Sequence, residues 1–146
     1  MPAADAAVLE AVVRREGRSL LQYLSDAYPW TNSAGDTTPD KVRELAREER
    51  DALAGLTKFL ARRRHAVPYL GAFPMAFTTM NFVSLDYLLP RLVEDGRRAL
   101  DALQRDHAAL TDAAARAELD KFLDLKRRHV KALEALATAP AAPAAH

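Results

Sequence analysis

The sequence predicts an all-α protein built as a four-helix bundle. Apolar residues recur at three- and four-residue steps over four stretches, each roughly 25 residues long. Segments that contain Pro and Gly separate the first three of these stretches, and the second such segment is long. Four amphipathic helices that each bury one face pack together as a bundle.

The composition fits a single soluble domain. The chain has 146 residues, of which 49% are hydrophobic and 28% charged. We expect residues 1–138 to form the bundle and the Ala/Pro-rich tail 139–146 to be disordered. The chain has no Cys, which excludes disulfides, thiolate zinc sites and cysteine nucleophiles. No apolar run is long enough to span a bilayer and no signal-peptide layout is present, so we expect a cytoplasmic protein.

The charge balance favours neither nucleic acid nor a membrane as partner. The 21 Lys and Arg residues face 20 Asp and Glu residues, and the net charge is +1. The cluster Arg62–Arg64 is the exception, and it is also what a helix C-terminus favours because cations complement the helix dipole. A nucleic-acid-binding bundle that uses this cluster is therefore the least favoured interpretation.

The first two predicted helices each carry a glutamate among their apolar residues. We expect residues 1–5 to be a loose leader and the first helix to cover residues 6–27, with Glu16 inside its apolar stripe. The second helix is expected over residues 39–65, after a cap at Thr37 or Thr38. Glu49 lies near the centre of its stripe, and we expect the neighbouring Glu48 and Asp51 to point away from that stripe.

Residues 66–77 form a long connection to the third helix. They contain three breaking residues, yet they are too apolar to lie in solvent. Fully extended, they would reach about 40 Å, which is about the length of a 25-residue helix. The sequence therefore predicts a crossover along the bundle between its second and third helices.

The last two predicted helices complete the bundle. The third begins at Thr78 or Ser84, contains Pro90 in its early turns and has Gly96 at the centre of its stripe. The fourth covers residues 112–137, with Thr111 as its expected cap. Its narrow apolar stripe consists of Leu119, Phe122, Leu123, Val130 and Leu133. Lys126 falls in the middle of that stripe, and His129 lies beside it.

Four polar residues are therefore predicted at the middle of the bundle. They are Glu16, Glu49, Lys126 and His129, on three different helices. A single buried charge costs several kcal/mol, whereas two carboxylates, an ammonium and an imidazole can neutralise one another. The alternative for each residue is a place at a bundle seam, with its stem packed and its polar end in water.

This pattern resembles the ferritin-like superfamily, which includes bacterioferritins and rubrerythrins. The resemblance covers nearly the whole chain as topology, including the long second connection. The segment Glu16-Gly-Arg-Ser-Leu-Leu-Gln22-Tyr23 is similar to the first-helix ligand segment of that family. In the family, the first and third helices each supply a glutamate, the second and fourth each supply Glu-x-x-His, and the group holds two iron ions.

Three of the six ligand positions differ in this chain. Ala52 stands where the family has the histidine of the second helix, Gly96 replaces the third-helix glutamate, and Lys126 replaces the fourth-helix glutamate. Iron prefers oxygen and imidazole donors of net negative charge, and an ammonium repels the cation. We therefore expect no cofactor, and a buried Lys–Glu network in place of the di-iron site.

Two functional interpretations follow, and the first is favoured. In the first, the chain is a non-catalytic ferritin-like protein that acts through self-association or a protein partner. In the second, Glu16, Glu49 and His129 retain a single metal, with iron as the expected cofactor, in a metal-binding protein or oxidoreductase. The sequence thus favours a protein that is not an enzyme.

Overall fold

A computed structural model describes residues 1–27, 37–81 and 83–138, and all its regular structure over these residues is helical. The predicted all-α class is therefore confirmed. The elements are the α-helices α1 (Ala3–Gly17), α2 (Leu20–Ala27) and α3 (Thr38–Arg62), the 3₁₀-helix η1 (Met75–Met80), and the α-helices α4 (Leu85–Ala109) and α5 (Ala113–Thr138). None of these helices has the length and apolarity that crossing a bilayer requires. The expected tail 139–146 lies outside the described residues.

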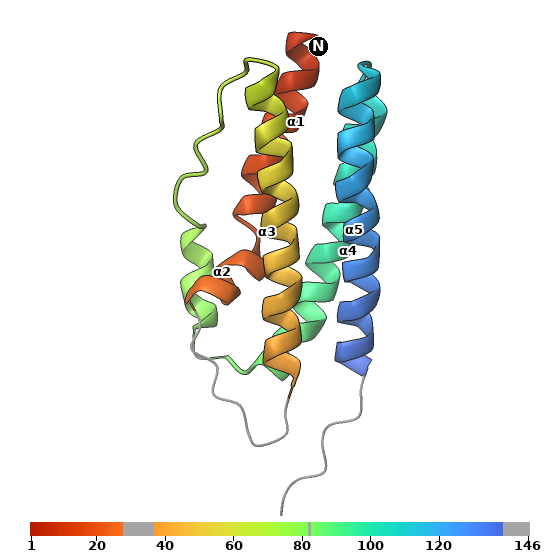
Figure 1. Ribbon diagram of the computed structural model, residues 1–146. Helices are drawn as coiled ribbons and strands as arrows, with labels where there is room; N and C mark the ends of the chain where they lie inside the picture. Colours follow the sequence, from red (N-terminus) through yellow and green to blue (C-terminus); the bar gives the residue numbers. More distant parts are fainter. Residues whose placement is uncertain (28–36, 82, 139–146) are drawn as a thin grey trace, which may run out of the picture.

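The helices α1, α3, α4 and α5 run side by side along one axis (Figure 1). In the view of Figure 1, α1 and α5 descend, whereas α3 and α4 both ascend. The chain that follows α3 runs down the outside of the molecule, through η1, to the lower end of α4. Consequently α3 and α4 point the same way although they are consecutive long helices.

The first predicted helix is in fact two helices, and this expectation was wrong. The chain breaks at Arg18 and Ser19, and α2 leaves the direction of α1 (Figure 1). The hydroxyl of Ser19 accepts a hydrogen bond from the backbone N–H of Gln22 at 3.2 Å, as an N-cap residue does. A glycine at the end of α1 followed by this serine explains the break, because Gly is a weak helix former and Ser favours a new helix start.

The expected loose leader is also wrong, because α1 begins at Ala3 and Asp5 is buried. The Asp5 carboxylate accepts the backbone N–H groups of Thr111 and Asp112, at 3.0 and 2.7 Å. These bonds, led by the one from Asp112, lower the pKa of Asp5. They fix the start of α1 to the turn between α4 and α5.

The cap of α5 differs from the predicted one, whereas Thr37 is the N-cap residue of α3, as predicted. Asp112, rather than Thr111, caps α5, since its carboxylate accepts the backbone N–H of Ala115 at 2.9 Å. The side chain of Thr111 is instead hydrogen-bonded to Asp5. At the start of α3, the side chain of Thr37 makes no capping bond, and Pro39 occupies the first turn.

The end of α3 is a Schellman turn that places Arg64 in the left-handed conformation, with φ of 62°. Its backbone N–H donates to the carbonyl of Ala61 at 3.0 Å, and that of His65 donates to the carbonyl of Leu60 at 2.9 Å. Glycine usually occupies this position because it has no Cβ to strain the backbone. The expected helix end at residue 65 is thus three residues too late.

We predict that Arg64→Gly stabilises the protein. The substitution removes the strain of a left-handed non-glycine residue, about 1–2 kcal/mol, and adds the backbone entropy of glycine, about 0.5–1 kcal/mol. The expected net gain is about 0.5–1 kcal/mol in the free energy of unfolding, measured by urea denaturation. Arg62→Gly, inside the helix, is the matched control and should destabilise. A loss of stability in Arg64→Gly would contradict the prediction.

The core consists of two hydrophobic clusters, one toward each end of the molecule. The first includes Leu9, Leu56 and Phe122, and the second includes Leu24, Leu88 and Leu133. The predicted stripe of the last helix is buried throughout. Between the two clusters lie the polar residues described next.

Candidate functional site

Glu16, Glu49, Lys126 and His129 come together in the middle of the molecule. Glu16 lies in the last turn of α1, Glu49 is central in α3, and the other two lie one turn apart on α5. Their exposed fractions are 2, 1, 5 and 2% respectively, so all four are buried. The alternative in which these residues lie at the seams of the bundle, with their polar ends in water, is therefore wrong.

The ammonium of Lys126 lies between two carboxylates. Its Nζ donates to Glu49 Oε1 at 2.9 Å and lies 3.1 Å from Glu16 Oε1. Burial alone would lower the pKa of Lys126, but the charges of Glu49 and Glu16 outweigh burial and raise it. Lys126 is therefore a buried cation, and its charge is compensated by carboxylates on two other helices.

Glu49 binds two cationic partners through its two oxygens. Besides the Lys126 contact, its Oε2 lies 2.8 Å from His129 Nδ1. Burial alone would raise the pKa of Glu49, but the nearby charge of Lys126 and the bond to His129 outweigh burial and lower it. The carboxylate is thus held in its ionised form.

His129 lies between two carboxylates, because its Nε2 is 2.8 Å from Glu48 Oε2. Both ring nitrogens donate in this arrangement only when the imidazole is protonated. Burial lowers the pKa of His129, but the hydrogen bonds to Glu49 and Glu48 outweigh that effect and raise it. The expectation that Glu48 points away was wrong: its side chain is 43% exposed, yet its carboxylate reaches α5.

Arg15 extends the network to α4. Its Nε donates to Glu16 Oε2 at 2.9 Å, and its Nη2 donates to Asp106 Oδ2 at 3.0 Å. In contrast, Glu16 Oε1 is buried and has no hydrogen bond of good geometry within the described residues, although Lys126 is within ion-pair distance. The predicted four residues are therefore part of a seven-residue network that also contains Arg15, Glu48 and Asp106.

Of the three additional residues, Glu48 and Arg15 carry a weak sequence signal. A buried imidazolium needs two hydrogen-bond acceptors. The helical wheel places Glu49 at the buried face as one of them, and Glu48 directly precedes it. Arg15 similarly precedes Glu16. Asp106 lies 91 residues away on another helix, so only the tertiary structure brings it to Arg15.

A pocket of about 270 Å³ borders the network, lined in part by Glu16, Lys126 and Gly96. Gly96 is buried, and a Cβ built there would lie 3.1 Å from Val130 Cγ2. Helices α4 and α5 therefore approach closely at this level, and a Cβ at position 96 would require the Val130 side chain to shift slightly. At position 96, helix α4 therefore supplies no side chain to the network, and its backbone lies close to α5.

The pKa shifts predict a stability maximum in mildly acidic solution. His129 has a raised pKa when folded, so its contribution is complete below its unfolded pKa of about 6.5 and is lost as the pH rises through the folded value. Glu49 has a lowered pKa, so its contribution is present above about pH 4.5 and is lost as the pH falls. We expect the melting temperature to fall by about 3–8 °C above this maximum.

Thermal melts between pH 5 and 9 measure this effect, and His129→Asn provides the comparison. The variant should be less stable at pH 6 and should lose the decline in stability that the wild type shows as the pH rises. Equal slopes in the two proteins would contradict the assignment of the decline to His129.

In this arrangement the positive charges of Lys126 and His129 lie against carboxylates. Among the described residues, the acceptor Glu16 Oε1 has no donor of good geometry. Within the described residues, no group of three or more His, Cys, Asp or Glu side chains has the geometry to hold a metal ion. Comparisons of the chain with protein-family models, with curated proteins and with solved structures found no match.

Proposed function

We infer that the chain is a non-catalytic protein of ferritin-like design, in which the Lys126 ammonium takes the place of a di-iron site. The observation that carries this proposal is the position of Lys126 Nζ, 2.9 and 3.1 Å from carboxylates of α3 and α1. In a ferritin-like arrangement these two carboxylates would ligate metal. Here they compensate a cation that the chain itself supplies.

The helix arrangement supports the ferritin-like part of the proposal. A four-helix bundle with one long crossover has its second and third long helices parallel, as α3 and α4 are (Figure 1). Glu16 and Glu49 then correspond to the glutamates of the first and second bundle helices. The break that separates α2 from α1 is a departure from that design.

The residues present do not fit a di-iron centre. An ammonium within 3.1 Å of both carboxylates would repel a dication held between them. Position 96 is a glycine and offers no side-chain ligand. Position 52, which would supply a histidine, is an alanine. The site therefore lacks the ligands that a di-iron centre would need.

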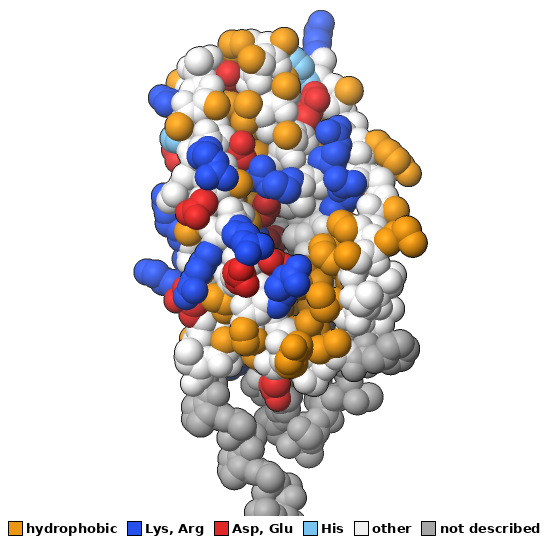
Figure 2. All heavy atoms as spheres, turned by 180° about the vertical axis from the view of Figure 1, so that it is seen from behind, with side chains coloured by type: hydrophobic (Ala, Val, Ile, Leu, Met, Phe, Trp, Pro, Cys, Tyr) orange, Lys and Arg blue, Asp and Glu red, His pale blue; other side chains and the backbone are white. Residues whose placement is uncertain are grey.

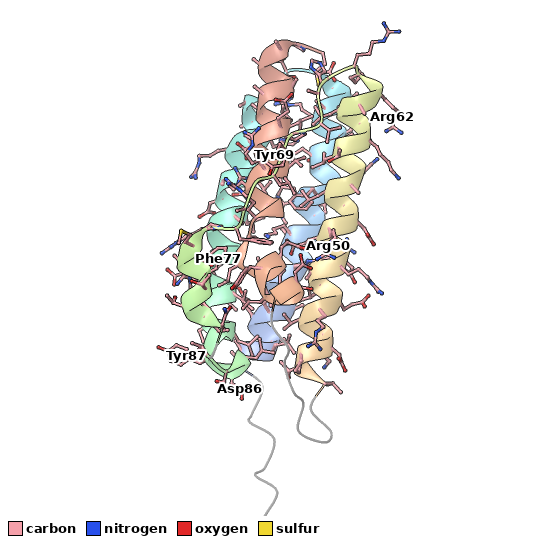
Figure 3. All side chains as sticks on the ribbon, turned by 90° about the vertical axis from the view of Figure 1, so that its left-hand side faces the viewer. Arg50, Arg62, Tyr69, Phe77, Asp86 and Tyr87 are labelled. Carbon is pink, nitrogen blue, oxygen red and sulfur yellow. The ribbon has the colours of Figure 1, made fainter. Side chains whose placement is uncertain are left out.

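The surface supports a role in self-association or partner binding. Several large hydrophobic side chains after α3 and at the start of α4 are exposed: Val67, Tyr69, Leu70, Met75 and Tyr87. Figure 3 shows Tyr69 high on the outer segment (residues 63–74) and Tyr87 near the lower end of the molecule, at the start of α4. On the face in Figure 2, Lys and Arg lie among Asp and Glu, with hydrophobic side chains toward the lower right. Such mixed charge favours a protein partner over a polyanion.

Metal analysis of the purified protein, combined with light scattering, tests the proposal. We expect no stoichiometric iron, zinc or manganese, and we expect a concentration-dependent oligomer that Tyr69→Ser with Tyr87→Ser weakens. Lys41→Ser, on the exposed face of α3, is the control for surface change. A stoichiometric metal that Glu49→Gln removes would establish the alternative, a single metal at Glu16, Glu49 and His129.

A further inference from the structure

A second pocket, of about 520 Å³, lies at the break between α1 and α2. Its walls come from the end of α1, from α2, from α3 and from the outer segment that follows α3. None of the seven network residues lines it, so it is separate from the site described above. Figure 3 shows the side of the molecule on which these elements meet, with Arg50 on α3 beside α2.

The local sequence explains why the pocket is there. At Arg18 the chain turns, and α2 leaves the direction of α1. No helix therefore continues α1 along this part of α3, and a space is left there. The outer segment covers this space, and it lies close to α1 because Gly17 has no side chain: a Cβ there would lie 3.0 Å from Leu70 Cδ1. Phe73 is held by an edge-on contact with Tyr23, with ring centroids 5.4 Å apart. The pocket is therefore formed by packed elements of the chain itself.

The floor and the roof of the pocket are apolar. Val13 and Leu53 are buried at its base, and Leu70 and Phe73 come from the outer segment. Ligand pockets of 300–1,000 Å³ typically combine such walls with a few polar groups that set orientation. The body of a fitting ligand is therefore a hydrocarbon chain.

The polar groups of the pocket are mainly cationic. Arg18, Arg50 and Lys58 line it together with a single acid, Asp26. Arg50 is already bound to Asp26 at 2.5 Å. Over residues 1–27, 37–81 and 83–138, no carboxylate lies within ion-pair distance of Arg18 or Lys58. Within the described part of the chain, these two positive charges at the pocket have no carboxylate partner, and they attract an anion.

Arg18 also presents a specific unmet hydrogen bond. Its Nε–H is buried and has no acceptor within the described part of the chain. A guanidinium and a carboxylate form strong, charge-assisted hydrogen bonds because both groups are ionised and planar. The Arg18 guanidinium, which lines the pocket, and the neighbouring apolar walls define the two ends of one ligand.

We propose that this pocket binds an aliphatic monocarboxylate. Its carboxylate accepts hydrogen bonds from Arg18 and is attracted by Lys58, while its hydrocarbon chain lies against Val13, Leu53 and Phe73. The binding site is independent of the Lys126 network and of whether that network holds a metal ion.

Isothermal titration calorimetry of the full chain with octanoate tests the proposal. We expect octanoate to bind, and 1-octanol and octylamine, which carry the same tail, to bind about tenfold or more weakly because each lacks the carboxylate. Arg18→Gln should weaken octanoate about tenfold to hundredfold and leave octanol unchanged. Lys58→Gln should weaken octanoate about two- to fivefold, since its charge is exposed.

Ala54→Phe provides a second variant that does not depend on Arg18. Ala54 is exposed at the pocket rim, so a ring there fills the pocket without entering the core, and octanoate binding should be lost. Ala117→Phe and Arg116→Gln, both exposed on α5, are the matched controls and should bind as the wild type. Absence of octanoate binding, equal binding of octanol, or unchanged binding in Ala54→Phe would overturn the proposal.

Discussion

Lys126→Met should lower the free energy of unfolding by about 3–5 kcal/mol at pH 7, the cost of removing one partner from a buried ion pair. The methionine keeps most of the buried stem but removes the cation between Glu16 and Glu49. Each carboxylate keeps one other partner, Arg15 or His129, so we expect a folded but destabilised protein. Urea denaturation followed by circular dichroism measures the loss.

A pH series separates this charge effect from a packing effect. In the variant, the facing carboxylates take up protons more readily, so the gap from the wild type should narrow as the pH falls toward 5. Adding Glu16→Gln should restore part of the lost stability, because it removes one of the two facing charges. Lys131→Met, exposed on the same helix, should change stability little. A loss that is constant with pH and is not rescued would show that Lys126 acts through packing alone.

Lys126→Glu should convert the network into a metal-responsive site, and this is the sharpest test of the proposed displacement. The change replaces the ammonium by a third carboxylate beside Glu16 and Glu49, with His129 one turn away. Without metal, the clustered negative charges should cost at least as much as Lys126→Met. With Zn(II) or Fe(II) at about a hundredfold excess over the dissociation constant, binding should return about 2.7 kcal/mol.

Thermal melts with and without each metal measure the response, under anaerobic conditions for Fe(II). If the variant is unfolded without metal, recovery of helical circular dichroism on metal addition provides the same information. The wild type and Lys131→Glu, a surface change on the same helix, should show no stabilisation. A folded Lys126→Glu protein that responds to neither metal would refute the idea that Lys126 stands in a metal position.

Much of the fold could be predicted because it depends on local periodicity. The apolar stripes of α3, α4 and α5 follow the 3.6-residue repeat, and most of the residues that a helical wheel selects are buried, with Leu45 and Leu100 half-buried. The same wheel places Glu16, Glu49 and Lys126 inside these stripes, and all three are buried. A residue's face on its own helix requires no knowledge of the neighbouring helices.

The features that were wrong or missed depend on contacts between distant segments. The predicted first helix, over residues 6–27, continued across the break between α1 and α2, since a change in helix direction does not interrupt the apolar spacing. Asp5 was assigned to a loose leader, because its partners lie more than a hundred residues away. Glu48 was placed outside the network because the wheel gives the direction of a Cβ and ignores the reach of a long side chain.

The sequence by itself determined the helical class, the buried faces of the long helices and the set of charges that those faces contain, because each follows from spacing along one helix. Only the tertiary structure decided that Lys126 lies between two carboxylates, that His129 bridges Glu49 and Glu48, and that a pocket opens beside Arg18. The physical reason is that ion pairs and cavities depend on distances between elements. Those distances are set by packing all the helices at once.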